Sequence, residues 1–569
     1  MQFSVWAPTA KSVDVVIGGQ RHALATDGDE YWQGEVHLPL EQGYRYSVDG
    51  GPAFPDPRSR WQRDGVHGDS FQSGLTLVQD SSFRAVPLCE ALIYELHVGT
   101  FTAEGTYRAA QAKLEYLQEL GVTHVELLPL ATFPGRHGWG YDGVDLFAPL
   151  PAYGSPTELA EFVQACHVRG IAVLLDVVYN HLGPDGNYLG KYGPYFTDHF
   201  KTNWGAAINY DGPYSDGVRR FVIDNALMWL RDYGFDGLRL DAVHAIFSFD
   251  AQPLLEELAL EVKRLGEALG RRFVLIAESD LNDPKLVLPQ TRGGYGLDAH
   301  WQDDFHHALH RYFTGETAGY YLDFRGLEDL ATALREGYVY QGQPSAHRHR
   351  RHGKPPRGVM PDQIVVSAQN HDQIGNRAQG ERLSMLLPSH QLKAIAALVL
   401  LSPFVPMLFQ GEEWGARTPF LYFTDHQDAA LGRLVSEGRS REFQSFKWQG
   451  EVPNPQDERT FLRSKLDWSE ISQAPHAELL DWHRQLIRLR RATARATPRT
   501  KPQVKFDAAK DWLTYTHGAL MARFNFSREA RKVPRPRGAW HLVLASGVGG
   551  ESDDSLPAGA IAVYRAALS

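Results

Sequence analysis

The sequence predicts an α/β protein, a (β/α)8 TIM barrel that carries an N-terminal β-sandwich and a small C-terminal β domain. Strand-like apolar runs alternate with amphipathic helical patterns over residues 89–495, which is typical of a parallel sheet. Eight such runs can be counted, the number that closes this kind of barrel. Alternating apolar and polar residues before and after this region predict the two flanking β domains, 1–88 and 496–569.

The N-terminal region reads as antiparallel β structure. Val13, Val15 and Ile17 alternate with polar neighbours, as do Tyr44 and Tyr46, and glycine-rich turns separate these runs. We expect a sandwich that resembles carbohydrate-binding domains and braces the next domain.

The barrel strands are predicted from short apolar runs. Residues 171–178 are apolar almost throughout, as expected of a strand that is buried on both faces. The full set of predicted strands is 92–96, 122–128, 171–178, 235–241, 273–278, 297–301, 364–369 and 404–409. A doubly wound open sheet is the alternative, but no glycine-rich phosphate loop follows the first strand.

Two of the intervening helices have clear boundaries. Ala110, Leu114 and Leu117 share one face and predict a helix over 107–120, which Gly121 ends. Ser155-Pro-Thr-Glu158 is a capping box with proline at the first helical position, so a second helix begins there.

Two polar segments interrupt the pattern. The insertion at about 181–217 contains Trp204 and follows the third strand, where loops form the working face of a barrel. The segment 338–361 holds His347-Arg-His-Arg-Arg-His352, which we interpret as a solvated surface run, with a loop that shapes the substrate site as the alternative. Beyond a helix near 476–493, strands are expected at 512–515, 520–526, 541–545 and 561–564.

Composition and charge exclude several functional classes. The 569 residues carry a formal net charge of −10, which argues against binding to nucleic acid or to anionic membranes. No apolar run approaches a membrane span, and no basic region followed by an apolar run stands at the N-terminus. We therefore expect a cytoplasmic protein that binds neither nucleic acid nor membrane, with its oligomeric state left open.

The two cysteines, Cys89 and Cys166, are predicted to be reduced and structural. No spacing of cysteine and histidine residues indicates a metal site, and no oxygen cage for calcium can be assembled around Asn180. We predict no required metal and no cofactor.

Polar residues stand at the ends of four predicted strands. Because the carboxyl ends of barrel strands meet at one mouth, three carboxyl groups are expected to converge there, from Asp241, Glu278 and Asp372. The neighbouring polar residues of these strand ends are Asp176, Asn180, His181, Arg239, Asn370 and His371.

Environment assigns different chemistry to two of the carboxyl groups. Arg239 and Asp241 are two residues apart on one strand, so their side chains leave the same face and the arginine favours an ionised carboxylate. A structural ion pair would be the simpler interpretation of Arg-x-Asp alone. Glu278 ends a very apolar strand, where desolvation favours a retained proton. A nucleophile and a general acid/base are what retaining glycoside hydrolysis requires.

Taken in order, residues 176–181, 237–241, Glu278 and 370–372 resemble the four signature regions of the α-amylase family of glycoside hydrolases, family 13. The resemblance implies that Asp241 is the nucleophile, that Glu278 is the acid/base, and that Asp372 stabilises the transition state. It further implies that the substrate-binding residues are Tyr141, His181, Arg239, His244 and His371, with Tyr141 stacked beneath the sugar ring.

Segments 94–101, 277–284 and 369–377 narrow the resemblance to family members that act on maltooligosyltrehalose and related α-1,4-glucans. It implies cleavage of the α-1,4 bond next to the terminal trehalose. The alternatives are a 1,4-α-glucan branching enzyme and a catalytically inactive glucan-binding relative. Ser279 and Gln373 stand where a branching enzyme is expected to carry Asp and Glu. Candidates for recognition of the trehalose unit are Trp204, His244, Glu412, Glu413 and Trp414, and packing or loop anchoring explains each of them equally well.

Overall fold

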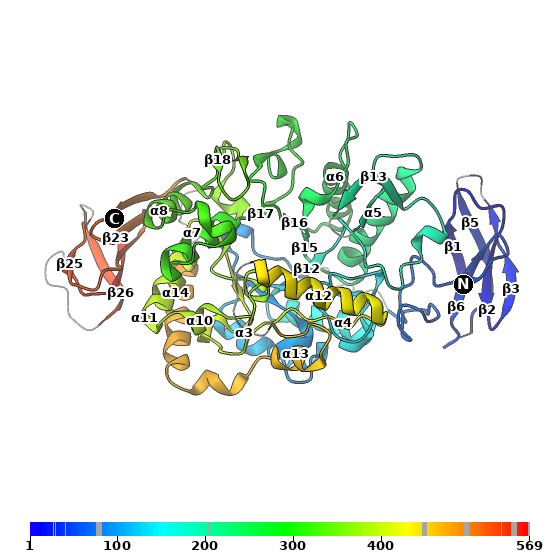
Figure 1. The fold of residues 1–569 in the computed structure, drawn as a ribbon, viewed down its shortest axis with the longest axis horizontal. Coiled ribbons are helices and arrows are strands. Elements are labelled where there is room, and N and C mark those ends of the chain that lie inside the picture. The colour runs from blue at the N-terminus through cyan, green and yellow to red at the C-terminus, as the bar shows by residue number, and fades with distance from the viewer. Residues whose placement is uncertain are drawn as a thin grey trace.

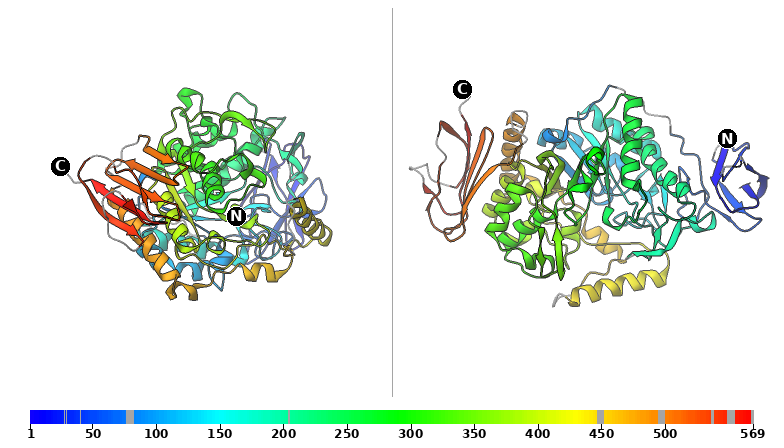
Figure 2. Two further views of the ribbon diagram at one scale, coloured as in Figure 1. Left: turned by 60° about the vertical axis from the view of Figure 1, so that its left-hand side comes forward. Right: turned by 90° about the horizontal axis from the view of Figure 1, so that it is seen from above.

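A computed structural model describes residues 1–569 apart from 27, 29, 40, 76–81, 203–204, 446–451, 494–499, 536–537, 548–554 and 567–569. The molecule is elongated: the barrel lies in the middle, and the N-terminal and C-terminal β regions lie at opposite ends (Figure 1). The view from above in Figure 2 shows the same order of parts.

Eight parallel strands close the central barrel in the order β12-β15-β16-β17-β20-β21-β8-β9. Each lies inside one of the eight predicted apolar runs, so the predicted barrel is confirmed. The strands are β8 (Ile93–Leu96), β9 (His124–Leu127), β12 (Ala172–Val177), β15 (Gly237–Leu240), β16 (Val274–Ala277), β17 (Ala299–Trp301), β20 (Ile364–Ser367) and β21 (Val405–Phe409).

The register of three neighbouring strands positions the polar residues at the barrel mouth. Asp176 in β12 pairs with Arg239 in β15, and Arg239 pairs with Ile276 in β16. All three strands are buried along their whole length. The chain therefore brings Asp176, Arg239 and the residues that follow Ile276 to one level of the barrel.

The predicted helix over 107–120 is wrong in one respect, because the structure has two helices there. They are α2 (Tyr107–Gln111) and α3 (Leu114–Leu120), and Lys113 between them has φ −97° and ψ −1°. The Lys113 ammonium lies 4.1 Å from the centre of the Trp468 ring, a cation–π contact that holds this turn. Gly121 ends α3 in the left-handed conformation, as predicted.

The capping box opens helix α4 (Pro156–Val168) as the sequence predicted. The Glu158 backbone amide donates to the Ser155 hydroxyl at 3.2 Å, and the Ser155 amide donates to the Glu158 carboxylate at 2.7 Å. Both amides would otherwise lack partners at the helix start.

Two small antiparallel sheets form the N-terminal region. Their strands are β1 (Gln2–Trp6), β5 (Tyr31–Glu35) and β4 (Ala25–Thr26) in one sheet, and β3 (Gln20–Ala23), β2 (Val13–Ile17), β6 (Tyr44–Val48) and β7 (Ala53–Phe54) in the other. Arg58 and Arg60 attach this region to the barrel through ion pairs of 2.7 and 2.8 Å with Asp224 and Asp232. Both acidic residues belong to helix α5 (Ser215–Asp232).

A five-stranded sheet forms the C-terminal region. Its order is β22 (Gln503–Asp507), β23 (Trp512–His517), β24 (Leu520–Asn525), β28 (Ile561–Ala566) and β26 (Trp540–Ser546). Strand β22 was not predicted; residues 503–507 are only partly buried, so their pattern carries less signal.

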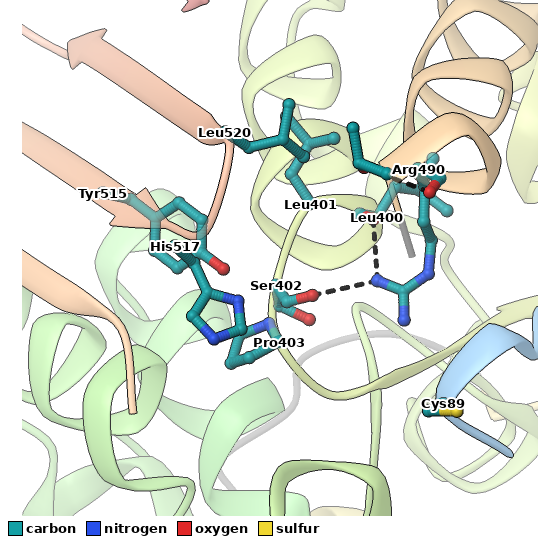
Figure 3. A pocket seen from close by; sticks show the side chains of 10 residues that line it. Cys89, Leu400, Leu401, Ser402, Pro403, Arg490, Tyr515, His517 and Leu520 are labelled. Carbon is teal, nitrogen blue, oxygen red and sulfur yellow. Dashed lines mark hydrogen bonds between the residues drawn. The ribbon is translucent and has the colours of Figure 1, made fainter. Parts of the chain in front are cut away.

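Arg490 lies where this sheet meets the barrel. It belongs to helix α14 (His476–Thr493), and its guanidinium donates to the carbonyls of Leu400, Ser402 and Phe404 at 3.0, 2.9 and 2.6 Å. A hollow of about 30 Å³ lies beside these groups, and Tyr515, His517 and Leu520 of the sheet form its other wall (Figure 3). The half-buried thiol of Cys89 is free, as is that of buried Cys166.

The two polar segments form hairpins. The first contains β13 (Phe196–Thr202) and β14 (Gly205–Ile208); Trp204 lies outside the described residues. The second contains β18 (Gln341–Ser345) and β19 (Arg350–Gly353). The interpretation as a solvated surface run is confirmed for His347, His349, Arg350 and Arg351, which are exposed, but not for His352, which is buried and donates to the Asp280 carbonyl at 2.7 Å. Arg348 forms an ion pair with the Asp280 carboxylate at 2.9 Å.

Within the described ranges, no helix is both long and apolar enough to cross a membrane.

Candidate active site

A buried guanidinium lies at the centre of the barrel mouth. Arg239 Nη1 lies 2.7 Å from Asp176 and 2.9 Å from Asp241, and Nη2 lies 3.4 Å from Glu278. The guanidinium carbon also lies 4.2 Å from the centre of the Trp301 ring. Two of the three predicted catalytic carboxyl groups are therefore in contact with one cation.

The Asp241 carboxylate is fixed from both sides. Arg239 donates to Oδ1 at 2.9 Å, and the Asn180 side-chain amide donates to Oδ2 at 2.7 Å and to the Asp241 carbonyl at 2.9 Å. His181 Nδ1 lies 2.5 Å from Asn180 Oδ1, and its Nε2 donates to the Tyr141 carbonyl at 2.9 Å. Burial lowers the pKa of His181. Charge-assisted hydrogen bonds of this kind stabilise an anion and hold it in one orientation.

Glu278 lies in a different environment from Asp241. Burial raises the pKa of Glu278 to about 8; Arg239 opposes the rise, while the negative charges of Asp241 and Asp372 add to it. The Ala242 backbone amide donates to its Oε2. Ala242 has φ 39°, a left-handed conformation that non-glycine residues seldom adopt. This strained turn places an amide directly on the Glu278 carboxyl group, and Glu278 holds its proton at neutral pH.

A chain of hydrogen bonds links the remaining predicted residues. His371 Nδ1 donates to Glu95 at 2.5 Å, and its Nε2 lies 2.7 Å from the Tyr141 hydroxyl, which in turn donates to Asp176 at 2.6 Å. Burial alone would lower the pKa of His371, but the charges of Asp372 and Glu95 outweigh it and raise the pKa to about 9. His371 is therefore a cation at neutral pH.

Asp372 lies on the open side of this chain. Its carboxylate is 3.6 Å from His371 Nε2, and its side chain is 43% exposed. In contrast, the side chains of His371 and Arg239 are almost fully buried. The mouth therefore has a buried cationic floor and an accessible carboxylate at its edge.

Comparison with known proteins places this geometry in a family. Residues 66–204 match the family model "Alpha amylase, catalytic domain". The chain is 47% identical over 560 residues to a malto-oligosyltrehalose trehalohydrolase of Rhizobium sp. (strain M-11), an alignment that covers 96% of this chain and 94% of the relative. It is 48% identical to the enzyme of that name from Arthrobacter ramosus, with 96% of each chain covered.

The chain belongs to the malto-oligosyltrehalose trehalohydrolase family.

Two further matches agree with this assignment. A crystal structure of a protein provisionally described as an alpha amylase, from Salmonella typhimurium, is 36% identical, with a TM-score of 0.89 and coverage of 99% of this chain and 97% of that one. A 1,4-alpha-glucan branching enzyme of Vibrio parahaemolyticus is only 29% identical and covers 61% of this chain. Trehalohydrolases are therefore much closer relatives than this branching enzyme.

Three polar residues of this trehalohydrolase-family site were given no role from the sequence, although Asn180 was named among the polar residues at the strand ends. Glu95 in β8 contacts His371, Asn180 contacts Asp241, and Asp303 lies near Glu278 and Asp372, whose charges interact with it. Burial raises the pKa of Asp303 to about 7, and Asp372 adds to the rise. Asp303 follows β17 by two residues, so the strand-end rule applied to the other strands would have found it.

The candidates for trehalose recognition have different surroundings. His244 is exposed on the short turn η4 (Val243–Ala245), directly after Asp241 and Ala242. Glu413 is fully buried and accepts hydrogen bonds from Tyr94 and Tyr116 at 3.0 and 2.8 Å. The buried residues Glu412 and Trp414 lie beside it on η9 (Glu412–Trp414), which favours packing over recognition for all three.

No group of three or more His, Cys, Asp or Glu side chains that could hold a metal ion is found among the residues with described positions. Asn180, the residue considered as a calcium ligand, has its amide group engaged by Asp241. The absence of a required metal stays a prediction.

Proposed function

We propose that this protein hydrolyses the α-1,4-glucosidic bond next to the terminal trehalose of maltooligosyltrehalose, releasing trehalose and a malto-oligosaccharide. The near full-length identity of 47% to a malto-oligosyltrehalose trehalohydrolase is the observation that carries this proposal. The barrel mouth supports it, because two carboxyl groups with different environments share the Arg239 guanidinium there.

In the first step Asp241 is the nucleophile and Glu278 is the general acid. The Asp241 carboxylate, oriented by Arg239 and Asn180, attacks the anomeric carbon of the glucosyl unit. Glu278 holds a proton at neutral pH and donates it to the glycosidic oxygen, so trehalose leaves as a neutral alcohol. A covalent glucosyl ester forms on Asp241 as the glycosidic bond breaks.

In the second step a water molecule attacks the same anomeric carbon. Glu278, now ionised, accepts a proton from that water, and the ester bond to Asp241 breaks. Two inversions at one carbon give net retention of configuration. The new reducing end is therefore released first as the α-anomer.

Asp372 and the hydrogen-bonded residues around it bind the sugar ring. The exposed Asp372 carboxylate can accept hydrogen bonds from sugar hydroxyls and balance positive charge that develops on the ring. Tyr141 supplies a flat ring, and His181 and His371 line the same mouth. We expect His244, which is exposed on η4, to face the leaving group.

One assay tests the proposed reaction. The protein is incubated separately with maltotriosyltrehalose and with maltopentaose, two substrates of equal length. Release of trehalose is followed by chromatography. We expect trehalose from the first substrate and a kcat/KM about tenfold or more above that for the second. A branching enzyme would instead reduce the iodine stain of amylose without releasing trehalose, and an inactive relative would turn over neither substrate.

Two other expectations stay predictions. The division at 1–88, 89–495 and 496–569 predicts that each β region can be removed as a unit; the second boundary falls in a segment outside the described residues. A cytoplasmic location is tested by fractionation of cells that produce the protein.

A further inference from the structure

A groove runs along the outside of the first polar insertion. It consists of two neighbouring hollows of about 620 and 650 Å³, which have Thr197 and Pro213 as common lining residues. The first lies against the N-terminal sheets at Thr9 and Asp49, and the second ends at Phe249. Figure 1 shows β13 and α5 on the side of the barrel that faces the N-terminal sheets.

Exposed aromatic rings line this groove. Phe249 is 75% exposed and Tyr214 is 46% exposed, and they are the two aromatic residues among the exposed large hydrophobic side chains of the described chain. Both line the groove, one in each hollow. Phe200 lies 5.4 Å from the Phe249 ring and stacks on Phe247 at 5.1 Å, so Phe249 belongs to a small aromatic cluster. Exposed aromatic groups gathered in a groove indicate a ligand site.

The polar groups between these rings suit a neutral ligand rich in hydroxyls. Asp49, Asp198 and Asp211 are among the lining residues, against a single lysine, Lys191. This excess of negative charge disfavours phosphates, nucleic acids and acidic peptides. Carboxylate oxygens accept hydrogen bonds from sugar hydroxyls, while aromatic rings pack on the apolar faces of sugar rings.

The groove is joined to the catalytic mouth by a short stretch of chain. Phe249 stands five residues after His244 and eight after Asp241. Its backbone amide donates to Asp211 at 3.1 Å, which ties the loop after the nucleophile to the insertion. A polymer bound along this groove would therefore contact the loop that follows the nucleophile.

We propose that this groove is a second binding site for an α-1,4-glucan chain, with Tyr214 and Phe249 as its stacking platforms. The choice of an α-1,4-glucan rests on the proposed function. The groove holds the chain by contacts outside the catalytic mouth, so it raises affinity for long chains and leaves the chemistry of short ones unchanged.

The test uses the full-length protein in native gels that contain amylose, with a β-1,4-glucan gel as the comparison. The Tyr214→Ala/Phe249→Ala variant is set against Leu322→Ala, which truncates a side chain that is 54% exposed at another surface site. We expect the groove variant to lose about fivefold or more of its apparent affinity for amylose, and the control variant to match the wild type.

Turnover of maltotriosyltrehalose separates this inference from the proposed function. We expect kcat and KM of the groove variant for this short substrate to stay within about twofold of the wild type, which also shows that the variant is folded. Unchanged retardation by amylose in the groove variant overturns the second site. The second site is also overturned if amylose does not retard the wild-type protein, or if the β-1,4-glucan retards it as strongly as amylose does. Wild-type protein that is retarded but inactive on maltotriosyltrehalose would contradict the proposed reaction and keep the glucan site.

Discussion

His371 Nδ1 lies 2.5 Å from Glu95 Oε1, and both side chains are about 1% exposed. Glu95 also accepts the His371 backbone amide at 3.1 Å. The carboxylate thus supports the charge and the orientation of an imidazole that contacts both Tyr141 and Asp372. Glu95 acts on the site through His371, so it is a positioning residue.

Glu95→Gln keeps the shape of the side chain but removes its negative charge. The pKa of His371, raised to about 9 in part by Glu95, should fall. A histidine with a raised pKa stabilises the fold below its unfolded pKa of about 6.5, and this stability is lost as pH rises through about 9. We expect kcat to fall about tenfold and the His371 titration, followed by NMR, to move to lower pH. An unchanged titration would show that Glu95 does not support the charge.

The raised pKa of Glu278 predicts that both activity and stability fall as pH rises. Above about pH 8 the general acid loses its proton, so kcat should fall there. The folded protein holds this proton between about pH 4.5 and pH 8 while the unfolded chain releases it, so stability falls across this window as pH rises. Glu278→Gln removes the free-energy cost of ionising this buried side chain. At pH 9 the inactive variant should be more stable than the wild type by on the order of a few kcal/mol, measured by denaturant unfolding. If the difference in stability between the variant and the wild type were the same at pH 5 and at pH 9, Glu278 would not have the raised pKa of a buried acid.

Arg239 can be tested with two substitutions of different kinds. Arg239→Met leaves Asp176 and Asp241 buried without their cation, and we expect a loss of about 3–5 kcal/mol in the free energy of unfolding. Arg239→Lys keeps the charge, but one ammonium group cannot reach three carboxyl groups in the geometry of a guanidinium. It should retain more stability while kcat falls by about 10²–10³. Near wild-type kcat in the lysine variant would show that the bridging geometry is unimportant.

The hairpin of β18 and β19 is connected to the acid/base residue through Asp280. Asp280 follows Glu278 by two residues and pairs with Arg348 at 2.9 Å. Arg348→Ala should loosen this loop and lower kcat/KM on maltotriosyltrehalose by about tenfold. The matched control is Arg350→Ala on the exposed part of the same hairpin, which should leave kcat/KM unchanged. Equal effects of the two substitutions would indicate a general effect of charge.

The barrel could be predicted from sequence because its strands are buried on both faces and read as continuous apolar runs. Asp241 and Glu278 could be found because each stands at the end of such a run. The contact of Glu95 with His371 could not, because 276 residues separate them and only closure of the barrel brings β8 beside β21 and near β20.

Local packing favours the packing interpretation of Glu413 and explains why the single helix predicted across Lys113 is wrong. Glu413 stands after a barrel strand, as catalytic residues do, but Tyr94 and Tyr116 hold its carboxylate inside the protein. Lysine is a residue type suited to a helix interior, yet Lys113 lies in a turn. There it contacts Trp468, which comes 355 residues later. Neither partner could be identified from the neighbouring sequence.

The covalent intermediate on Asp241 is the most direct test of the proposed reaction. Glu278→Gln protein is incubated with a maltosyl fluoride, whose leaving group needs no general acid, and the digested protein is mapped by mass spectrometry. We predict a maltosyl adduct on the peptide that contains Asp241, and none in the Asp241→Ala/Glu278→Gln control. An adduct on another residue, or a β-anomeric product formed directly by the wild type, would contradict it.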